Sequence, residues 1–303
     1  MTMISDNWAE ALEPGLRGIF TQAMSDYKNF PDYRKKIFTV EGSQRAFEEF
    51  LGVGGTGTMD EWDNSVGVSY EDTEKGFKPL FRHKKFSKGK KIERELYDDN
   101  MYGEIKSRIL SLADSVYFTY QEHAANVFNN AFNASFYGAD GKALCATDHP
   151  KLPNSSNTFS NAGTYELTAE NVENVRTKMM EWTDDKGNEI LALPDTLIVP
   201  TTLRKTALII AETKEEPFQS DYGVNVWSNG SLKVIEWPFL TDPNAWFMVA
   251  SGRKKRDLLW FDRRKPDFAN EKTFDTEVAK YKVVARFSYG WKTPYFIYGC
   301  NPS

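Results

Sequence analysis

The sequence predicts an α+β fold in which antiparallel strands predominate. In the stretch FDTEVAKYKVVARFSYGW, every second residue from Ala279 to Trp291 is apolar, which is typical of a strand with one buried face. At roughly 3.3 Å per residue, this stretch spans on the order of 45 Å. From about Asp98 to Asn133, apolar residues recur every three or four positions, which predicts a helix of roughly 50 Å. We therefore expect an elongated, flat molecule in which a long helix packs along a long strand.

These two elements supply the predicted core. Its members are the apolar residues that share one face of the helix or of the strand, and burying them would hold the two elements together. From the helix they are Ile105, Ile109, Leu112, Val116 and Phe128, and from the strand Tyr281, Val283 and Phe287.

The segments before the long helix are interpreted as an arm and a hairpin. Residues 1–59 read as an N-terminal arm with two short helices around PDYRKK, and residues 60–92 as an extended loop. In that loop SVGVSY forms the outgoing strand, EDTEKG the turn and FKPLFRHKKFSKGKK the returning strand. The returning strand is either a solvated arm or an arm that reaches onto a neighbouring subunit. Its basic residues are Arg82, Lys84, Lys85, Lys88, Lys90 and Lys91.

Composition limits the class of protein. A chain of 303 residues with 40% hydrophobic and 27% charged residues can form one large or two modest domains. The net charge of −5 argues against tight wrapping of nucleic acid, which requires a basic surface. Two cysteines make no disulfide framework, and the longest apolar run, Ala207 to Ala211, is too short to cross a bilayer. The acidic N-terminus, broken by Pro14, is no signal peptide, so we expect synthesis in a reducing cytosol without membrane association.

Motifs for catalysis or cofactor binding are weak. Gly52, Gly54 and Gly57 have the spacing of a dinucleotide loop, but they follow a helical pattern, which favours a flexible hinge. Cys145 and His149 are four residues apart, yet no second pair completes a metal site, so structural roles are favoured. We expect His123 to pack on the helix and Cys300 to fill space. The sequence thus predicts no catalytic residues, no metal, no cofactor and no enzymatic activity.

Six segments in a fixed order resemble a known family. They are DDNMYGEIKSRI, HAANVFNNAFN, GADGKALCATDHP, PDTLIVPTTL, LTDPNAWFM and FDTEVAKYKVVARFSYGWKTPYFIYG. Together they resemble the major capsid (major head) protein of tailed bacteriophages, and the Mu-like major head subunit in particular. The resemblance extends from about Trp62 to Gly299.

The resemblance implies a Hong Kong 97-type fold with a division into arm, loop, peripheral and axial parts. The parts are an N-terminal arm (1–59), an extended loop (60–92), a peripheral domain with the spine helix (93–190), an axial domain (191–254), peripheral strands (255–291) and a C-terminal strand that returns to the axial domain (292–303).

It also implies a function and partners. The chain would form hexamers and pentamers of an icosahedral head in the virion, assembled in the host bacterial cytoplasm around double-stranded DNA without sequence-specific binding. A portal would be a partner, and the short segment before the loop suggests that scaffolding comes from a separate protein. The basic loop residues would contact a neighbouring subunit.

Three alternatives remain open. An encapsulin-like nanocompartment shell protein shares this fold but encloses enzymes. Some relatives join a loop lysine to an asparagine of a neighbour, and Asn270 lies in a suitable turn, although no motif requires this bond. A small-molecule enzyme would need a cleft with convergent ionisable groups, and the sequence offers no such constellation.

Overall fold

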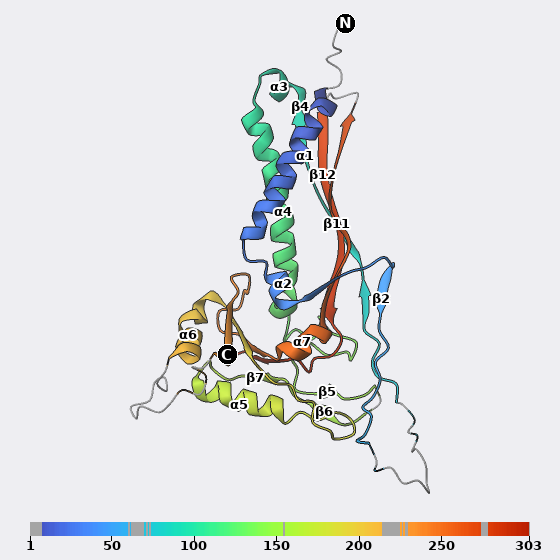
Figure 1. Cartoon of the computed structure of the whole chain (residues 1–303), viewed down its shortest axis with the longest axis vertical. Helices are drawn as coiled ribbons and strands as arrows, with labels where there is room; N and C mark the ends of the chain where they lie inside the picture. Colours follow the sequence, from blue (N-terminus) through green and yellow to red (C-terminus); the bar gives the residue numbers. More distant parts are fainter. Residues whose placement is uncertain are drawn as a thin grey trace.

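The molecule is elongated, with a tall part of helices and long strands above a broader base (Figure 1). The computed structural model describes residues 8–59, 61, 70, 72, 74–153, 155–213, 225, 227, 230–273 and 278–302. Helices and strands are mixed along the chain, and the predicted α+β class is confirmed.

The helices do not lie in a single layer. They are α1 (Trp8–Asp26), η2 (Tyr27–Asn29), α2 (Tyr33–Ile37), α3 (Arg94–Asp98), α4 (Tyr102–Asn129), α5 (Ala169–Met180), η3 (Thr201–Leu203), α6 (Arg204–Glu212) and α7 (Ser251–Asp257). The strands are β1 (Thr39–Gly42), β2 (Phe47–Glu49), β3 (Leu80–Arg82), β4 (Lys84–Glu93), β5 (His149–Pro150), β6 (Thr158–Phe159), β7 (Ala162–Gly163), β8 (Thr196–Val199), β9 (Lys233–Glu236), β10 (Trp246–Val249), β11 (Leu258–Thr273), β12 (Val278–Trp291) and β13 (Ile297–Cys300).

The tall part is built on one sheet, here called the long sheet, with the strand order β1-β11-β12-β4. β11 and β12 pair antiparallel from Leu258↔Trp291 to Thr273↔Val278, with irregular register between Asp262 and Asp267. β4 pairs antiparallel with β12 on the other side, and β1 runs parallel to β11. The 14 residues of β12 give about 46 Å of strand, and the 28 residues of α4 give about 42 Å of helix. The two long elements therefore match in length.

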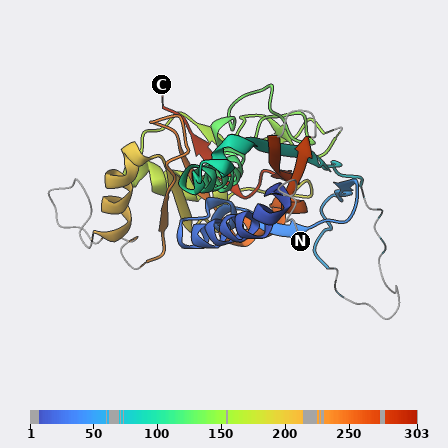
Figure 2. The same ribbon diagram turned by 90° about the horizontal axis from the view of Figure 1, so that it is seen from above.

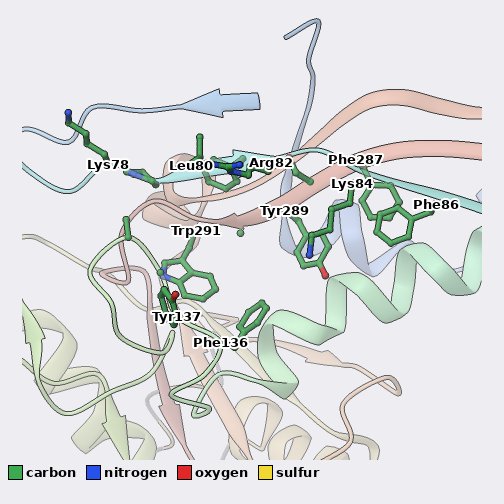
Figure 3. Close-up of a pocket in the computed structure, with 16 residues that line it drawn as sticks. Lys78, Leu80, Arg82, Lys84, Phe86, Phe136, Tyr137, Phe287, Tyr289 and Trp291 are labelled. Carbon is green, nitrogen blue, oxygen red and sulfur yellow. The ribbon is translucent and has the colours of Figure 1, made fainter. Parts of the chain in front are cut away.

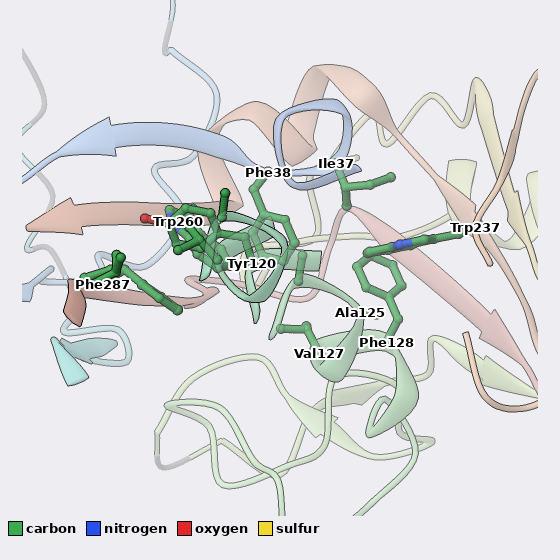
Figure 4. Close-up of a cluster of buried hydrophobic side chains, with 14 of the residues drawn as sticks. Ile37, Phe38, Tyr120, Ala125, Val127, Phe128, Trp237, Trp260 and Phe287 are labelled. Atoms are coloured by element: carbon green, nitrogen blue, oxygen red, sulfur yellow. The ribbon is translucent and has the colours of Figure 1, made fainter. Parts of the chain in front are cut away.

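Helices α1 and α4 lie on one side of the long sheet (Figures 1 and 2). The side chain of Phe287 on β12 stacks on Trp260 with 4.7 Å between ring centroids and meets Tyr120 of α4 at 5.1 Å. Figure 4 shows these rings in the cluster that joins helix and sheet. All eight predicted core residues are buried, with exposed fractions between 0% for Ile109 and 8% for Val116.

The base is built on a second sheet with the order β7-β13-β10-β8-β9. One face of this sheet, including Ile198 and Phe247, belongs to the same core as the long sheet. The opposite face, including Leu197 and Met248, packs with α5 and α6. In the C-terminal segment, β13 pairs antiparallel with β10 of this sheet.

The boundary expected at residue 190 does not coincide with a change in packing. Val172, Val175 and Met179 of α5 are fully buried in the core of the second sheet, and Trp182 is 6% exposed in the same core. These residues belong with the base and not with the spine helix. The apolar stripe of α5 was recognised in the sequence, but a stripe does not reveal which sheet covers it.

Two helices differ from expectation. The spine helix begins at Tyr102 and not at Asp98, because Asn100 adopts a left-handed backbone conformation (φ 57°) that separates α3 from α4. The N-terminal arm contains α1, a helix of 19 residues that holds Pro14, where only two short helices were expected. Leu16 and Phe20 of α1 are buried in the core that α4 and the long sheet share.

The basic returning strand of the expected loop is the outer strand of the long sheet. Residues 84–93 pair with β12 along their whole length, so this part does not protrude as a separate arm. The expected outgoing strand, SVGVSY, lies outside the described residues except for Tyr70, whose side chain is exposed.

Candidate functional site

The Cys145–His149 pair does not form a nucleophile and base. His149 is fully buried, with Nδ1 2.6 Å from Asp140 Oδ2 and Nε2 3.0 Å from Asn161 Oδ1. Both ring nitrogens of His149 thus interact with Asp140 and Asn161 and not with the Cys145 thiol. Burial raises the pKa of the Cys145 thiol well above its ordinary value, which makes the thiolate scarce at neutral pH.

The other candidate groups are structural as well. His123 Nδ1 lies 2.9 Å from the Tyr289 hydroxyl between helix and sheet, and Cys300 is fully buried in the core of the base. In the part of the chain that the structure describes, no three His, Cys, Asp or Glu side chains are placed to hold a metal ion. The described helices include none that is long and apolar enough to span a bilayer.

The glycine motif lies where the extended loop begins, and there residues 52–54 pair with residues 74–77. We call this paired segment the loop root. Gly52 N–H donates to the Phe77 carbonyl (2.8 Å), and Gly76 N–H donates to the Gly52 carbonyl (2.9 Å). A Cβ on Gly52 would lie 2.5 Å from the Phe77 oxygen, so the two strands of this ribbon need glycine to approach each other. Gly55 N–H donates to Asp185 Oδ1 (2.7 Å), which fastens the ribbon to the base. The motif therefore shapes a loop root and does not open a helix over a phosphate.

The basic residues of the returning strand divide between two faces of the long sheet. Lys84, Lys88 and Lys90 are paired in register with Phe287, Val283 and Tyr281, whose side chains are in the core. Because paired residues share a face, these three lysines lie on the helix-facing side of the edge strand. Lys85 and Lys91 pair with Arg286 and Lys280 on the opposite face. Arg82 ends β3 beside a groove.

This groove, of about 450 Å³, lies between β3, the start of β4, the end of β12 and the turn after α4 (Figure 3). Among the residues that the structure describes, its lining is aromatic and basic and contains no carboxylate. Phe136 and Trp291 meet at one end with 5.8 Å between ring centroids. The basic lining residues are Lys78, Arg82 and Lys84, so the groove suits an acidic or aromatic segment better than a basic one.

A buried histidine joins three segments at the loop root. Ser43 Oγ donates to Glu48 Oε1 (2.7 Å), so it accepts from His83 Nε2–H (3.0 Å). His83 Nδ1 is then left to accept from the Ser288 hydroxyl (2.9 Å). Burial, followed by nearby Arg286, lowers the pKa of His83, which favours this neutral form.

The sequence gives no signal for the Ser43–His83–Ser288 contact or for the Gly55–Asp185 contact. Their members lie 40 to 205 positions apart along the chain. Residues so far apart have no characteristic spacing in the sequence, because only folding brings them together. The basic run and the glycine motif were visible in the sequence, but their division between faces and their role at the loop root were not.

One comparison with known proteins identifies a family. A family model described as phage capsid protein matches residues 78–299. A search of curated protein sequences gives no match.

Solved structures share the fold at low sequence identity. The chain in the procapsid of bacteriophage JBD30 is 15% identical (TM-score 0.52), and the match covers 97% of this chain and 76% of that one. The capsid chain of the native GTA particle is 11% identical (TM-score 0.55), with 89% of each chain covered. A chain of Mycobacterium phage Patience is 10% identical (TM-score 0.54), with 99% and 88% covered. The expected Hong Kong 97-type fold is confirmed.

Proposed function

The chain belongs to the phage capsid protein family and is a major capsid protein of an icosahedral head, and from this premise we propose how it assembles. Its place is the capsid of the virion. The proposed assembly units are hexamers and pentamers of this chain in a Mu-like head that encloses double-stranded DNA. The six ordered sequence segments support the Mu-like assignment.

The observation that carries the proposal is the match of the family model over residues 78–299, which includes β4, the spine helix and most strands of both sheets. The elongated shape supports the proposal, because a flat subunit offers long sides to several neighbours. We infer that a separate scaffolding protein and a portal take part, that the DNA is held without sequence-specific contacts, and that the chain acts as a structural protein without catalysis. We also propose the division into arm, loop, peripheral and axial parts, with one change. Helix α5 is assigned to the base and not to the peripheral part that holds the spine helix.

Electron microscopy of the purified chain, alone and with a co-expressed scaffolding protein from the same phage, tests the assignment. We expect rings, tubes or closed shells, and closed shells should contain both six-fold and five-fold units. A chain that sediments only as a compact monomer at high concentration under both conditions would overturn the proposal. Encapsulin-like assembly has no separate observation in its favour and would appear as shells that enclose enzymes instead of DNA.

A further inference from the structure

The long sheet ends on one side in a strand whose outer edge is free. β4 is the last strand in the order β1-β11-β12-β4, and its 10 residues span about 33 Å. The strand at the opposite end of the sheet, β1, has only 4 residues. Edge strands present unpaired N–H and C=O groups, and a short edge strand presents few of them. The long sheet therefore offers its longer free edge at β4.

Alternate residues of β4 direct their backbone groups to this free edge. A Cβ on Gly89 would lie 3.8 Å from the Cβ of its partner Lys282, a close approach typical of pairs that exchange no backbone hydrogen bonds. The Lys91 carbonyl accepts from Arg108 Nη1–H (2.8 Å), as expected for an outward group two residues further on. The residues with this orientation are Lys85, Ser87, Gly89 and Lys91. Among the strands that the structure describes, none pairs with this edge.

An aromatic groove runs beside this edge, on the side of the sheet that faces α4. Phe86 and Phe287 line both the groove of about 450 Å³ described above and a second hollow of about 280 Å³ between β4 and α4. Their rings stack with 4.3 Å between centroids, side by side above the spine helix (Figure 3). Phe86 also lies 4.6 Å from the His123 ring and is only partly buried. The groove thus has an accessible aromatic floor.

The edge and its groove carry unbalanced positive charge. Lys84 and Lys88 line the groove, and Lys85 leaves the opposite face of the same strand. In the described part of the chain, no carboxylate forms an ion pair with these three lysines. Glu122 is the one carboxylate among the described residues that line the two hollows. Lysines can protect an edge strand from aggregation, but protection does not require an aromatic groove beside the strand.

We propose that β4 receives an extended acidic segment of a partner protein as an added strand. The outward backbone groups of Lys85, Ser87 and Gly89 exchange hydrogen bonds with the segment. Side chains of a strand alternate between two faces, so Asp or Glu residues on both faces of the segment lie near lysines of β4. One aromatic residue of the segment packs against Phe86 in the groove. The inference goes beyond the proposed assembly, because it concerns a partner other than the capsid chain.

The chemistry of the edge favours a polypeptide over DNA. The edge presents C=O groups as well as N–H groups, and DNA phosphates only accept hydrogen bonds. The charges favour a partner over a second copy of β4, because pairing of β4 with itself places lysines near lysines, which is destabilising. An acidic polypeptide strand satisfies the backbone groups and the charges together.

Peptide binding to the unassembled chain tests the proposal. The probe is a fluorescein-labelled peptide in which glutamates alternate with threonines on either side of a central phenylalanine. Fluorescence anisotropy should show saturable binding, and the same peptide with lysine in place of glutamate should bind at least about tenfold more weakly. Lys84→Glu combined with Lys88→Glu should reverse this preference. The control pair, Lys205→Glu with Lys233→Glu, changes exposed lysines of α6 and β9 and should keep it. Circular dichroism should show both variants folded.

Hydrogen exchange distinguishes an added strand from charge attraction alone. The amide hydrogens of Lys85, Ser87 and Gly89 should exchange at least about tenfold more slowly in the bound chain, because they donate to the peptide. A probe methylated at the backbone nitrogens that face β4 keeps its charges but should not bind.

Four outcomes would overturn the inference. They are equal binding of the two peptides, unchanged preference after reversal of Lys84 and Lys88, binding of the methylated probe, and unprotected edge amides in the bound chain. Slow exchange of the edge amides at high protein concentration without peptide would assign the edge to a second copy. Displacement of the peptide by duplex DNA without amide protection would assign the lysines to DNA. Shell formation by the wild-type chain tests the capsid assignment separately, so either proposal can fail without the other.

Discussion

At the scale of single residues, Arg34 shows how the N-terminal region is held on the long sheet. Its guanidinium donates from Nη1 to both carboxylate oxygens of Asp262, at 3.0 and 3.2 Å, and its side chain is only 9% exposed. It also lies over the Tyr120 ring, 4.5 Å from the centroid. One side chain thus connects α2, β11 and the spine helix through an ion pair and a cation–π contact.

Arg34→Ala should destabilise the chain by about 3–5 kcal/mol, because the largely buried Asp262 carboxylate would lose its cation and keep only the hydrogen bond from Trp260 Nε1–H. Lys35→Ala is the matched control, since its ion pair with Asp32 is solvent-exposed and worth about 0–1 kcal/mol. Denaturant unfolding of the two variants measures the difference. Equal costs would show that the buried pair contributes no more than a surface pair.

His83 should make stability depend on pH. Its folded-state pKa is lowered by burial and by Arg286 and Arg263, against an opposing effect of Glu48, so the native state binds fewer protons than the unfolded state. Its contribution is therefore complete above the unfolded pKa of about 6.5 and is lost as the pH falls below it.

The melting temperature should fall between pH 7 and pH 5, and His83→Gln should reduce this fall. Burial also lowers the pKa of His123, so His123→Gln separates the two contributions. An unchanged pH profile in the His83 variant would show that the Ser43–His83–Ser288 contact tolerates protonation.

At the scale of secondary structure, the alternation of apolar residues predicts strands that bury one face, and their recurrence every three or four positions predicts such helices. β12 and α4 follow this rule, and the residues that the patterns assign to the interior, such as Phe287 and Ile109, are buried. Pattern reasoning failed for α1, because Pro14 suggests a break, and for the start of α4, because Asn100 interrupts a continuous apolar stripe. It also could not divide the lysines of β4 between faces, since that depends on pairing with β12.

The loop root is an element whose backbone leaves no room for a side chain. A Cβ on Gly76 would lie 2.7 Å from the Gly52 carbonyl carbon and 2.9 Å from Val53 N. Gly76→Ala should open the ribbon and increase proteolytic cleavage between residues 50 and 80. Gly103→Ala is the control: its Cβ would meet nothing within 4 Å, and alanine should stabilise α4 by up to about 1 kcal/mol. Equal cleavage rates in both variants would contradict a close-packed ribbon.

At the scale of the whole molecule, the second sheet joins the tall part to the base, because its two faces belong to two different cores. Phe128, near the end of α4, lies at this junction. Its ring is 5.1 Å from that of Trp237 and 5.3 Å from that of Phe247 on β10. The spine helix is therefore anchored at its lower end in the sheet of the base, and we expect the two parts to unfold together.

Phe128→Ala should cost about 3–5 kcal/mol, as truncation of a buried phenylalanine does, and should lower the melting temperature of the whole chain without splitting the transition. Phe118→Ala, on the same helix but 49% exposed, is the control and should have little effect. Calorimetry of the unassembled chain, combined with tryptophan fluorescence, follows both parts at once, since Trp260 lies in the tall part and Trp182 in the base. Two separate transitions in the wild-type chain, with only one shifted by Phe128→Ala, would show that the shared sheet does not couple the two cores.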